Sequence, residues 1–181
     1  MPQSFDLFFA SSNFNKFQEA KKILGGFGIN LGFFQCKMEE IQSNSLKEIA
    51  KNKAMQAFHK CKKPLIVEDD GLFIDSLNGF PGPYSSYVFK TIGNKGILNL
   101  VKQNRKAKFV SIISFYDKKN NESFESKVNG FISKKIMGRG WGYDPIFIPS
   151  NSKKVFAQLN KNQISHRFKA LKKFSNWYLP K

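Results

Sequence analysis

Residues 65–71 read LIVEDDG, in which a short apolar run leads directly into three adjacent carboxylates. The run Leu65–Val67 is typical of a buried strand, and the largely apolar residues 71–74 that follow argue against an acidic turn facing solvent. Adjacent carboxylates repel one another, so the group Glu68–Asp70 is costly unless a cation or lysines neutralise it. Carboxylates at a strand end suit Mg²⁺, which prefers oxygen ligands, so the stretch predicts a metal site in an α/β fold.

The N-terminal segment predicts a strand, loop and helix unit. FDLFFA at 5–10 reads as a strand, and the following residues read as a loop into a helix that Asn13 caps and Gly25–Gly26 ends. Backbone N–H groups and the dipole at a helix start favour anions, although neither the Walker pattern nor G-x-G-x-x-G occurs. The candidate phosphate-binding side chains of this loop are Ser11, Ser12, Asn13 and Lys16.

A second helix is predicted from Ser45, which forms an S-x-x-E capping box with Glu48, to about Lys60. At 100° per residue, Lys53 falls inside the apolar stripe of this helix. An ammonium group there is costly without an anion to meet it. Lys53 is therefore either a ligand contact or a lysine whose head reaches solvent from the edge of the stripe.

The C-terminal half predicts further strands and helices. Residues 79–87 are a Gly/Pro turn that opens a short helix, and the segments 108–117 and 123–136 read as paired strands around a polar turn. The last helix, from about 165 to 179, places Arg167 on the line of its apolar residues, so this arginine is expected to face inward. The pattern as a whole is mixed α/β.

Length and composition favour one domain. A chain of 181 residues can bury one core, so we expect a single domain over residues 1–181, or two lobes that share one sheet. Cys36 and Cys61 show no C-x-x-C spacing and no nearby histidine pair, which argues against a disulfide scaffold or zinc site and favours a cytoplasmic location. No run of about 18 apolar residues and no signal-peptide pattern occurs, so no membrane partner is expected.

The net charge of +17 suits an anionic small-molecule substrate, an acidic membrane or a nucleic acid. Of the 30 basic residues only Arg105, Arg139 and Arg167 are arginine, whereas reading of base edges depends on the guanidinium fork. A solvated lysine surface is therefore favoured over specific nucleic-acid binding. A basic nucleic-acid-binding module without catalysis remains the alternative from another functional class.

The stretch GWGYDPIF at 140–147 suggests a pocket for a nucleobase. Trp141 or Tyr143 offers a flat ring for stacking, and the glycines allow close approach of the backbone, although a core aromatic turn would look similar. SHR at 165–167 adds polar donors, including a guanidinium that can bond a purine carbonyl.

In chain order, five motifs resemble the inosine/xanthosine triphosphate pyrophosphatase family over about Leu7 to Leu171. They are SSNFNKFQEA, EIQ with EIAKNKA, VEDDGLFIDSLNGFPGPYSSY, GWGYDPIF and QISHRFKAL. The resemblance implies an elongated mixed sheet flanked by helices, two lobes with a central nucleotide cleft, and a homodimer. It also implies a hydrolase that uses Mg²⁺ to convert ITP, dITP or XTP into the monophosphate and pyrophosphate, removing deaminated purines from the nucleotide pool.

The same resemblance assigns roles to residues. Glu40 and Asp69 are the implied metal ligands; Asp69 is also the implied base for the attacking water, and Lys53 reaches the phosphates. The loop with Asn13 and Lys16 resembles the triphosphate grip. An arginine aimed at the C6 substituent accepts hypoxanthine and rejects adenine. The implied base pocket consists of Trp141, Gly142, Tyr143, Asp144, Lys161, His166 and Arg167.

The chain departs from the family pattern at several positions. Asp70 stands where the family commonly has Ser, next to the phosphates, and its charge is expected to weaken triphosphate binding unless it faces the metal or a lysine. Gln158 replaces a frequent Glu, and Trp141 a commoner Phe. A pyrophosphatase of the same fold acting on other modified or pyrimidine nucleotides is the related alternative.

Overall fold

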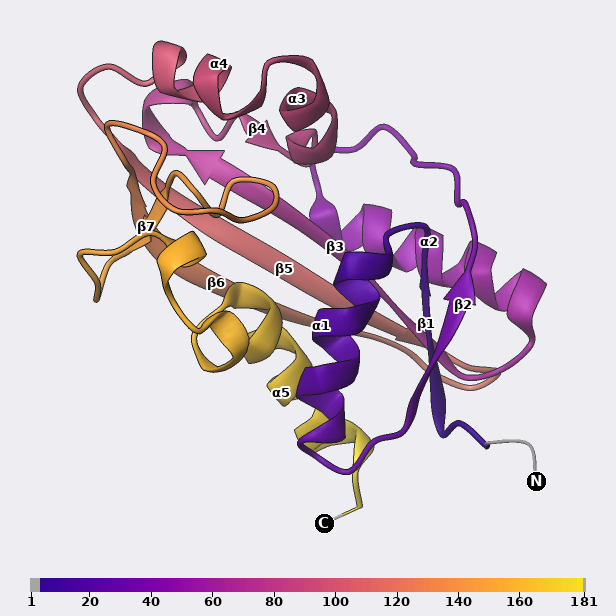
Figure 1. Ribbon diagram of the computed structural model, residues 1–181. Coiled ribbons are helices and arrows are strands. Elements are labelled where there is room, and N and C mark those ends of the chain that lie inside the picture. Colours follow the sequence, from indigo (N-terminus) through magenta and orange to yellow (C-terminus); the bar gives the residue numbers. More distant parts are fainter. Residues whose placement is uncertain (1–3, 181) are drawn as a thin grey trace. The chain divides into compact units, whose positions relative to one another are not determined.

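The structure is a computed structural model that describes residues 4–180 (Figure 1). The chain divides into two compact units, each described in turn below. The first runs through Asp69 and adds Ser111–Ser126 and the chain from Arg167 onward. The second consists of Asp70–Val110 and Lys127–His166. A single domain with two lobes therefore stays a prediction.

Within residues 4–180 the strands form a seven-stranded mixed sheet of order β2-β1-β3-β5-β6-β7, with β4 paired to β3. Strand β1 is parallel to β2 and to β3, whereas β4 and β7 are antiparallel to their partners. The strands are β1 Leu7–Ser11, β2 Leu31–Gln35, β3 Leu65–Ile74, β4 Pro81–Gly82, β5 Lys106–Tyr116, β6 Asn121–Ile132 and β7 Phe147–Pro149. The helices are α1 Phe14–Gly25, α2 Leu46–Cys61, α3 Ser85–Thr91, α4 Gly93–Leu100 and α5 His166–Tyr178. The predicted mixed α/β class is confirmed.

The predicted start and end of α1 are confirmed. The side-chain oxygen of Asn13 accepts hydrogen bonds from the N–H groups of Asn15 and Lys16, at 3.0 and 3.4 Å. The helix ends at Gly25, and the backbone N–H of Gly26 closes its last turn. An N-cap of this kind satisfies donors that the first helical turn leaves without partners.

Helix α2 has the predicted N-cap but only half of the predicted capping box. Ser45 Oγ accepts from the N–H of Glu48 at 3.3 Å. The carboxylate of Glu48 accepts from Ser43 Oγ at 2.7 Å, and Ser45 N–H donates to that same hydroxyl at 2.9 Å. The hydroxyl of Ser43 therefore bridges the two groups in place of the expected return bond.

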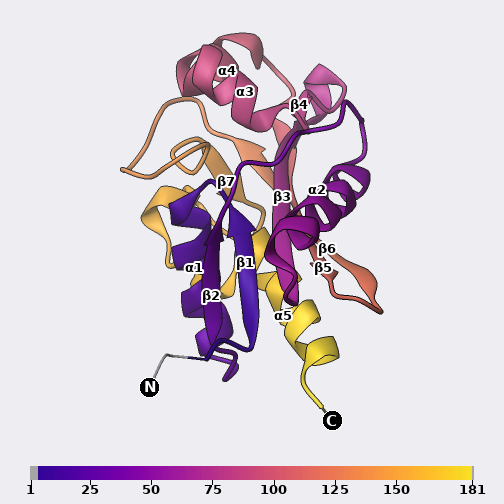
Figure 2. The same ribbon diagram turned by 90° about the vertical axis from the view of Figure 1, so that its right-hand side faces the viewer.

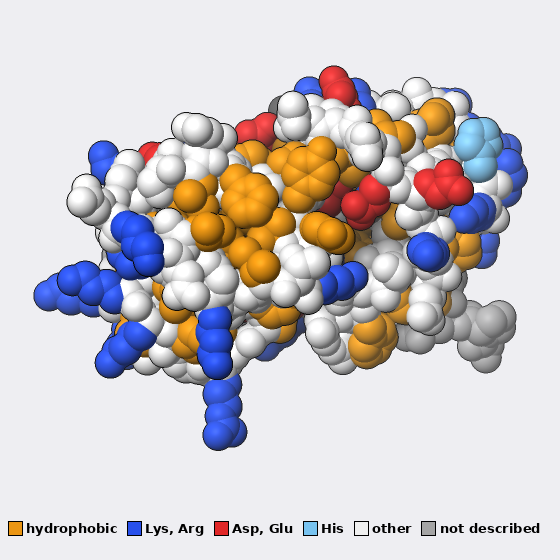
Figure 3. Space-filling view, turned by 90° about the horizontal axis from the view of Figure 1, so that it is seen from above, with side chains coloured by type: hydrophobic (Ala, Val, Ile, Leu, Met, Phe, Trp, Pro, Cys, Tyr) orange, Lys and Arg blue, Asp and Glu red, His pale blue; other side chains and the backbone are white. Residues whose placement is uncertain are grey.

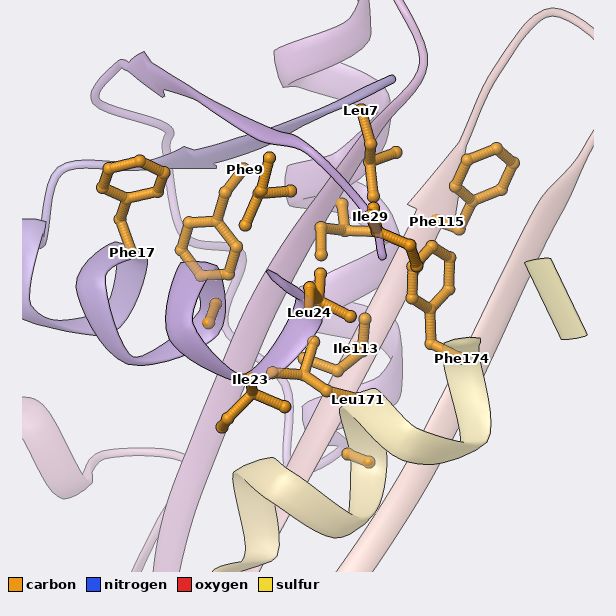
Figure 4. Packing of buried hydrophobic residues seen from close by; sticks show 14 residues of the cluster. Leu7, Phe9, Phe17, Ile23, Leu24, Ile29, Ile113, Phe115, Leu171 and Phe174 are labelled. Carbon is orange, nitrogen blue, oxygen red and sulfur yellow. The ribbon is translucent and has the colours of Figure 1, made fainter. Parts of the chain in front are cut away.

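The core of the first unit lies between its strands and the helices α1 and α5 (Figure 4). Helix α2 lies on the opposite side of these strands from α1, as Figure 2 shows. Each fully buried Leu, Ile or Phe contributes about 1.5–3 kcal/mol relative to exposure. The side chains labelled in Figure 4 are Leu7, Phe9, Phe17, Ile23, Leu24, Ile29, Ile113, Phe115, Leu171 and Phe174.

The second unit has a core of its own, built on the remaining parts of the long strands together with α3, α4 and β7. Its centre is aromatic: the ring of Phe109 meets that of Phe147 edge-on, with centroids 4.8 Å apart, and lies 6.0 Å from that of Phe156. Such edge and offset contacts are the preferred aromatic geometries. Among residues 4–180, no helix is both long and apolar enough to cross a membrane.

Candidate active site

Strand β3 runs through the acidic stretch instead of ending before it. The prediction that the carboxylates lie at a strand end is wrong, because Leu65–Ile74 is one strand and Glu68 and Asp69 are buried within it. Successive side chains of a strand point to opposite faces, so Asp69 points away from the face shared by Glu68 and Asp70. Asp69 is paired with the Lys53 ammonium and Glu68 with the Arg167 guanidinium, and these two cations offset the repulsion within the strand. Asp70 lies beside the ring of His166.

Lys53 lies between two carboxylates of the first unit. Its ammonium donates to Glu40 Oε1 at 2.6 Å and to Asp69 Oδ2 at 3.1 Å. Lys53 and Asp69 are buried, whereas the side chain of Glu40 is exposed. The sequence predicted that an ammonium inside the apolar stripe of α2 requires an anion, and Asp69 is that anion.

One oxygen of Glu40 and one of Asp69 both contact the Lys53 ammonium, so the two carboxylates face the same positive charge. Mg²⁺ is commonly bound by one or two carboxylates and completes its shell with water and substrate phosphate. This donor pair therefore fits a hard divalent cation shared with a phosphate ligand. Among residues 4–180, no group of three or more His, Cys, Asp or Glu side chains is arranged to hold a metal ion.

Arg167 is almost completely buried at 2% exposure, as its inward position in the sequence pattern predicted. Its Nε donates to Glu68 Oε2 at 2.7 Å, and its Nη1 donates to Glu19. Ser111 Oγ donates to the other oxygen of Glu68 at 2.8 Å. Removing either partner of such a buried pair leaves a charge without compensation, so this network is expected to stabilise the first unit.

Sequence reasoning missed Glu19 and Ser111 as partners in this network. The available signal for Glu19 was that it is the one acidic residue of α1, in a helix that also carries three lysines. The proposed contact between Arg167 and a purine carbonyl stays a prediction.

The loop of candidate phosphate ligands follows β1 in the first unit. Parallel pairing sets Phe9 opposite Ile66, so the end of β1 lies level with the acidic part of β3. Ser11 Oγ accepts from the N–H of Asn13 at 3.0 Å, which shapes the turn into α1. Lys16 in the first turn is half-buried, and Ser12 is exposed. An anion at this helix start would meet backbone N–H groups and the positive end of the dipole.

Three predicted base-pocket residues of the second unit lie together. The Lys161 ammonium donates to Asp144 Oδ2 at 2.5 Å and lies 5.3 Å from the centroid of the Trp141 ring. The aromatic face attracts the cation, and the carboxylate holds it in place. Gly142, between Trp141 and Tyr143, has a φ of +60°, a conformation that favours glycine.

The two aromatic candidates of this motif differ in their surroundings. Tyr143 is buried in the core of the second unit, where its hydroxyl donates to the carbonyl of Ser85 at 2.9 Å. Burial raises the pKa of Tyr143, so the hydroxyl remains a donor. Trp141 is only partly buried. Of the two rings, Trp141 is therefore the one that could offer a face to a ligand.

His166 is the last member of the candidate site in the second unit, and it is buried at 5% exposure. Its ring is parallel to that of Phe109, with centroids 4.5 Å apart and planes 6° apart. Its Nε2 lies 3.6 Å from Asp70 Oδ2. Among the described residues, neither ring nitrogen has a hydrogen-bond partner, although buried polar groups normally have one in the protein, in water or in a ligand.

Comparison with known proteins extends the resemblance drawn from the motifs. A sequence model of the Ham1 family matches residues 7–177. A dITP/XTP pyrophosphatase of Methanopyrus kandleri is 46% identical over 177 residues, which cover 94% of each chain. That of Hyperthermus butylicus is 44% identical over 174 residues, or 93% of this chain and 92% of the relative. A solved HAM1 protein from Coxiella burnetii aligns with a TM-score of 0.83 at 26% identity, covering 97% of this chain and 98% of its own.

Proposed function

The chain belongs to the Ham1 family, and from that membership we propose that it hydrolyses dITP, ITP and XTP to the nucleoside monophosphate and pyrophosphate. The enzyme would thereby remove deaminated purines from the nucleotide pool. The observation that carries the proposal is the buried pair of Lys53 and Asp69, with Glu40 on the same ammonium, in a chain that such pyrophosphatases match along nearly its whole length.

Asp69 is proposed as the base. Water adds to phosphorus, the anhydride between the α- and β-phosphates breaks, and the proton of the water passes to the Asp69 carboxylate. Lys53, within hydrogen-bond distance of Asp69, holds that carboxylate in place. Mg²⁺ held by Glu40 and Asp69 would offset negative charge on the phosphates. Lys16 and the N–H groups at the start of α1 would hold the remaining phosphate oxygens.

The base is proposed to bind among Trp141, Asp144, Lys161, His166 and Arg167. Trp141 supplies a stacking face, and Asp144 holds Lys161 beside it. Arg167, oriented by its glutamate partners, is proposed to donate to the C6 carbonyl that deaminated purines carry. Adenine presents an amino group there, so the buried guanidinium would lose a hydrogen bond.

We also propose a homodimer that acts in the cytoplasm. The second unit exposes large apolar side chains around α3, and Tyr87 among them is 69% exposed. Figure 3 shows apolar side chains gathered on the face seen from above, and α3 and α4 lie at the top of Figure 1. Contiguous exposed apolar patches mark interaction sites. Sedimentation equilibrium tests the dimer, and Tyr87→Lys is expected to yield monomer. The free thiols Cys36 and Cys61 suit a reducing compartment.

The experiment that tests the function is product analysis on a panel of triphosphates. The enzyme with Mg²⁺ is incubated with dITP, XTP, GTP, ATP, dTTP and UTP, and the nucleotides are separated by ion exchange. The proposal expects monophosphate and pyrophosphate in equal amounts from dITP and XTP. Diphosphate and orthophosphate as products would contradict it, and faster turnover of dTTP or UTP would instead favour the pyrophosphatase for pyrimidine or other modified nucleotides.

A further inference from the structure

The ring of His166 has its plane fixed by neighbouring aromatic rings. Phe109 is parallel to it at 4.5 Å, and Phe156 lies at 6.1 Å with a plane tilted by 30°. Two features of the imidazole then remain open. A half-turn about the Cβ–Cγ bond keeps the ring plane and exchanges nitrogen and carbon positions, and either nitrogen can carry the proton. Stacking favours neither orientation of the ring and neither tautomer, so both depend on another neighbouring group.

Asp70 lies where its charge can favour one orientation and one tautomer of the His166 ring. Its Oδ2 lies 3.6 Å from His166 Nε2, and both side chains are largely buried, at 16% and 7% exposure. The separation is too long for a hydrogen bond, but it is short enough for the charge of the carboxylate to act on the dipole of the ring. An ionised carboxylate only accepts, so it favours a ring turned with Nε2 toward it and a proton on that nitrogen. In the neutral ring the other nitrogen, Nδ1, is then a bare acceptor.

We infer that Asp70 is a positioning residue that makes His166 Nδ1 a hydrogen-bond acceptor for an N–H group of the bound purine. The inference rests on the proposed function, in which His166 lines the base pocket. Hypoxanthine and xanthine carry a hydrogen on N1, whereas adenine presents a bare nitrogen there. Asp70 and His166 together therefore disfavour adenine, whose N1 has no hydrogen to donate to Nδ1. Guanine shares the N1 hydrogen and is not rejected by this contact.

This role reverses the effect expected of Asp70 from the sequence, where its charge was expected to weaken triphosphate binding. The two roles predict opposite results for the same substitutions. Asp70→Asn keeps the shape of the side chain and removes its charge, and Asp70→Ser introduces the residue that is common in the family. Thermal unfolding of both variants verifies that each is folded before it is compared with the wild type.

The first test is the ¹⁵N NMR spectrum of the histidine rings in the full-length protein without nucleotide, at a pH where they are neutral. The chain has two histidines, and His59 on the exposed side of α2 serves as the internal reference. In the wild type His166 is expected to be a single species with its proton on Nε2, and in both variants a mixture or the other tautomer. An unchanged His166 spectrum in both variants would overturn the inference.

The second test is steady-state kinetics with dITP and ATP. Loss of one hydrogen bond to the base is expected to raise KM for dITP by about 3- to 10-fold in Asp70→Asn, with little change in kcat. The preference for dITP over ATP is expected to fall as well. In a His166→Gln background Asp70→Asn is expected to have no further effect. A lower KM for dITP in either variant would overturn the inference, because Asp70 would then act on the phosphates.

The two tests separate this inference from the proposed function. If the wild type released no pyrophosphate from any deaminated purine nucleotide, the proposed function would fail, and the contact with N1 would fall with it. The NMR measurement would still decide whether Asp70 sets the tautomer of His166.

Discussion

The two units of the molecule treat their buried polar groups in different ways. In the first, opposite charges meet directly, as Lys53 and Asp69 do at 3.1 Å. In the second, polar groups also lie against aromatic rings: the Lys161 ammonium, which is paired with Asp144, lies over Trp141, and His166 is stacked on Phe109. The first arrangement suits charged phosphates and a cation, and the second suits a flat base that needs few polar contacts. A nucleotide carries both kinds of chemistry, in its phosphates and in its base.

The largest effect is expected from Asp69→Asn, which breaks the charge arrangement of the first unit at its proposed base. Loss of a general base typically lowers the rate by about 10²–10⁴-fold, and we expect kcat for dITP to fall by that factor. Pyrophosphate release is the measurement. Asp75→Asn, at an exposed position of the second unit, is the matched control and is expected to keep its activity. Wild-type turnover by Asp69→Asn would contradict the assignment.

Arg167→Met removes the cation of the buried network in the same unit, where Arg167 pairs with Glu68 and Glu19. Glu68, whose side chain is fully buried, loses a charged partner, so we expect the free energy of unfolding to fall by about 3–5 kcal/mol. Urea denaturation followed by circular dichroism measures this. The exposed Arg139 provides the control, since Arg139→Met is expected to change stability by no more than about 0.5 kcal/mol. Equal stability of the two variants would show that the network contributes nothing.

Trp141→Ala tests the aromatic side of the comparison. Stacking of a base on an aromatic ring contributes about 1–3 kcal/mol, so KM for dITP is expected to rise by at least about fivefold, with kcat and stability little changed. Trp141→Phe keeps a flat ring and is expected to stay close to the wild type. If the alanine variant bound dITP as the wild type does, Trp141 would not be the stacking face.

Lys53→Gln sharpens the comparison by removing the cation that Glu40 and Asp69 share. Without the ammonium, the two carboxylates are expected to bind Mg²⁺ about tenfold more tightly in the absence of nucleotide. Isothermal titration calorimetry measures this, and Lys47→Gln on the exposed side of α2 is the control. Unchanged affinity would mean that the two carboxylates are not the metal ligands.

Local features of the fold were predictable from the sequence, because they depend on neighbouring residues. The Asn13 and Ser45 caps, the glycine stop of α1 and the inward position of Arg167 follow from spacing alone. The course of β3 was not predictable. Three adjacent carboxylates look unsuitable for a buried strand until their partners are known, and Lys53 precedes them by more than ten residues in sequence.

The pairings within the candidate site were not predictable from the sequence. Motif spacing identified Lys53, Asp69 and Arg167, and the structure adds which group meets which. Glu19 lies 148 residues from Arg167, and no local pattern connects them. The stacking of His166 on Phe109 likewise depends on how α5 meets β5, which periodicity does not reveal.

The central claim is that this chain selects deaminated purine triphosphates and cleaves them to pyrophosphate. It is tested most directly by kcat/KM for dITP and XTP against ATP, measured as pyrophosphate release with Mg²⁺. A site that hydrogen-bonds the purine edge is expected to prefer dITP and XTP over ATP by a factor on the order of 10⁴. Equal values for dITP, XTP and ATP would contradict the account.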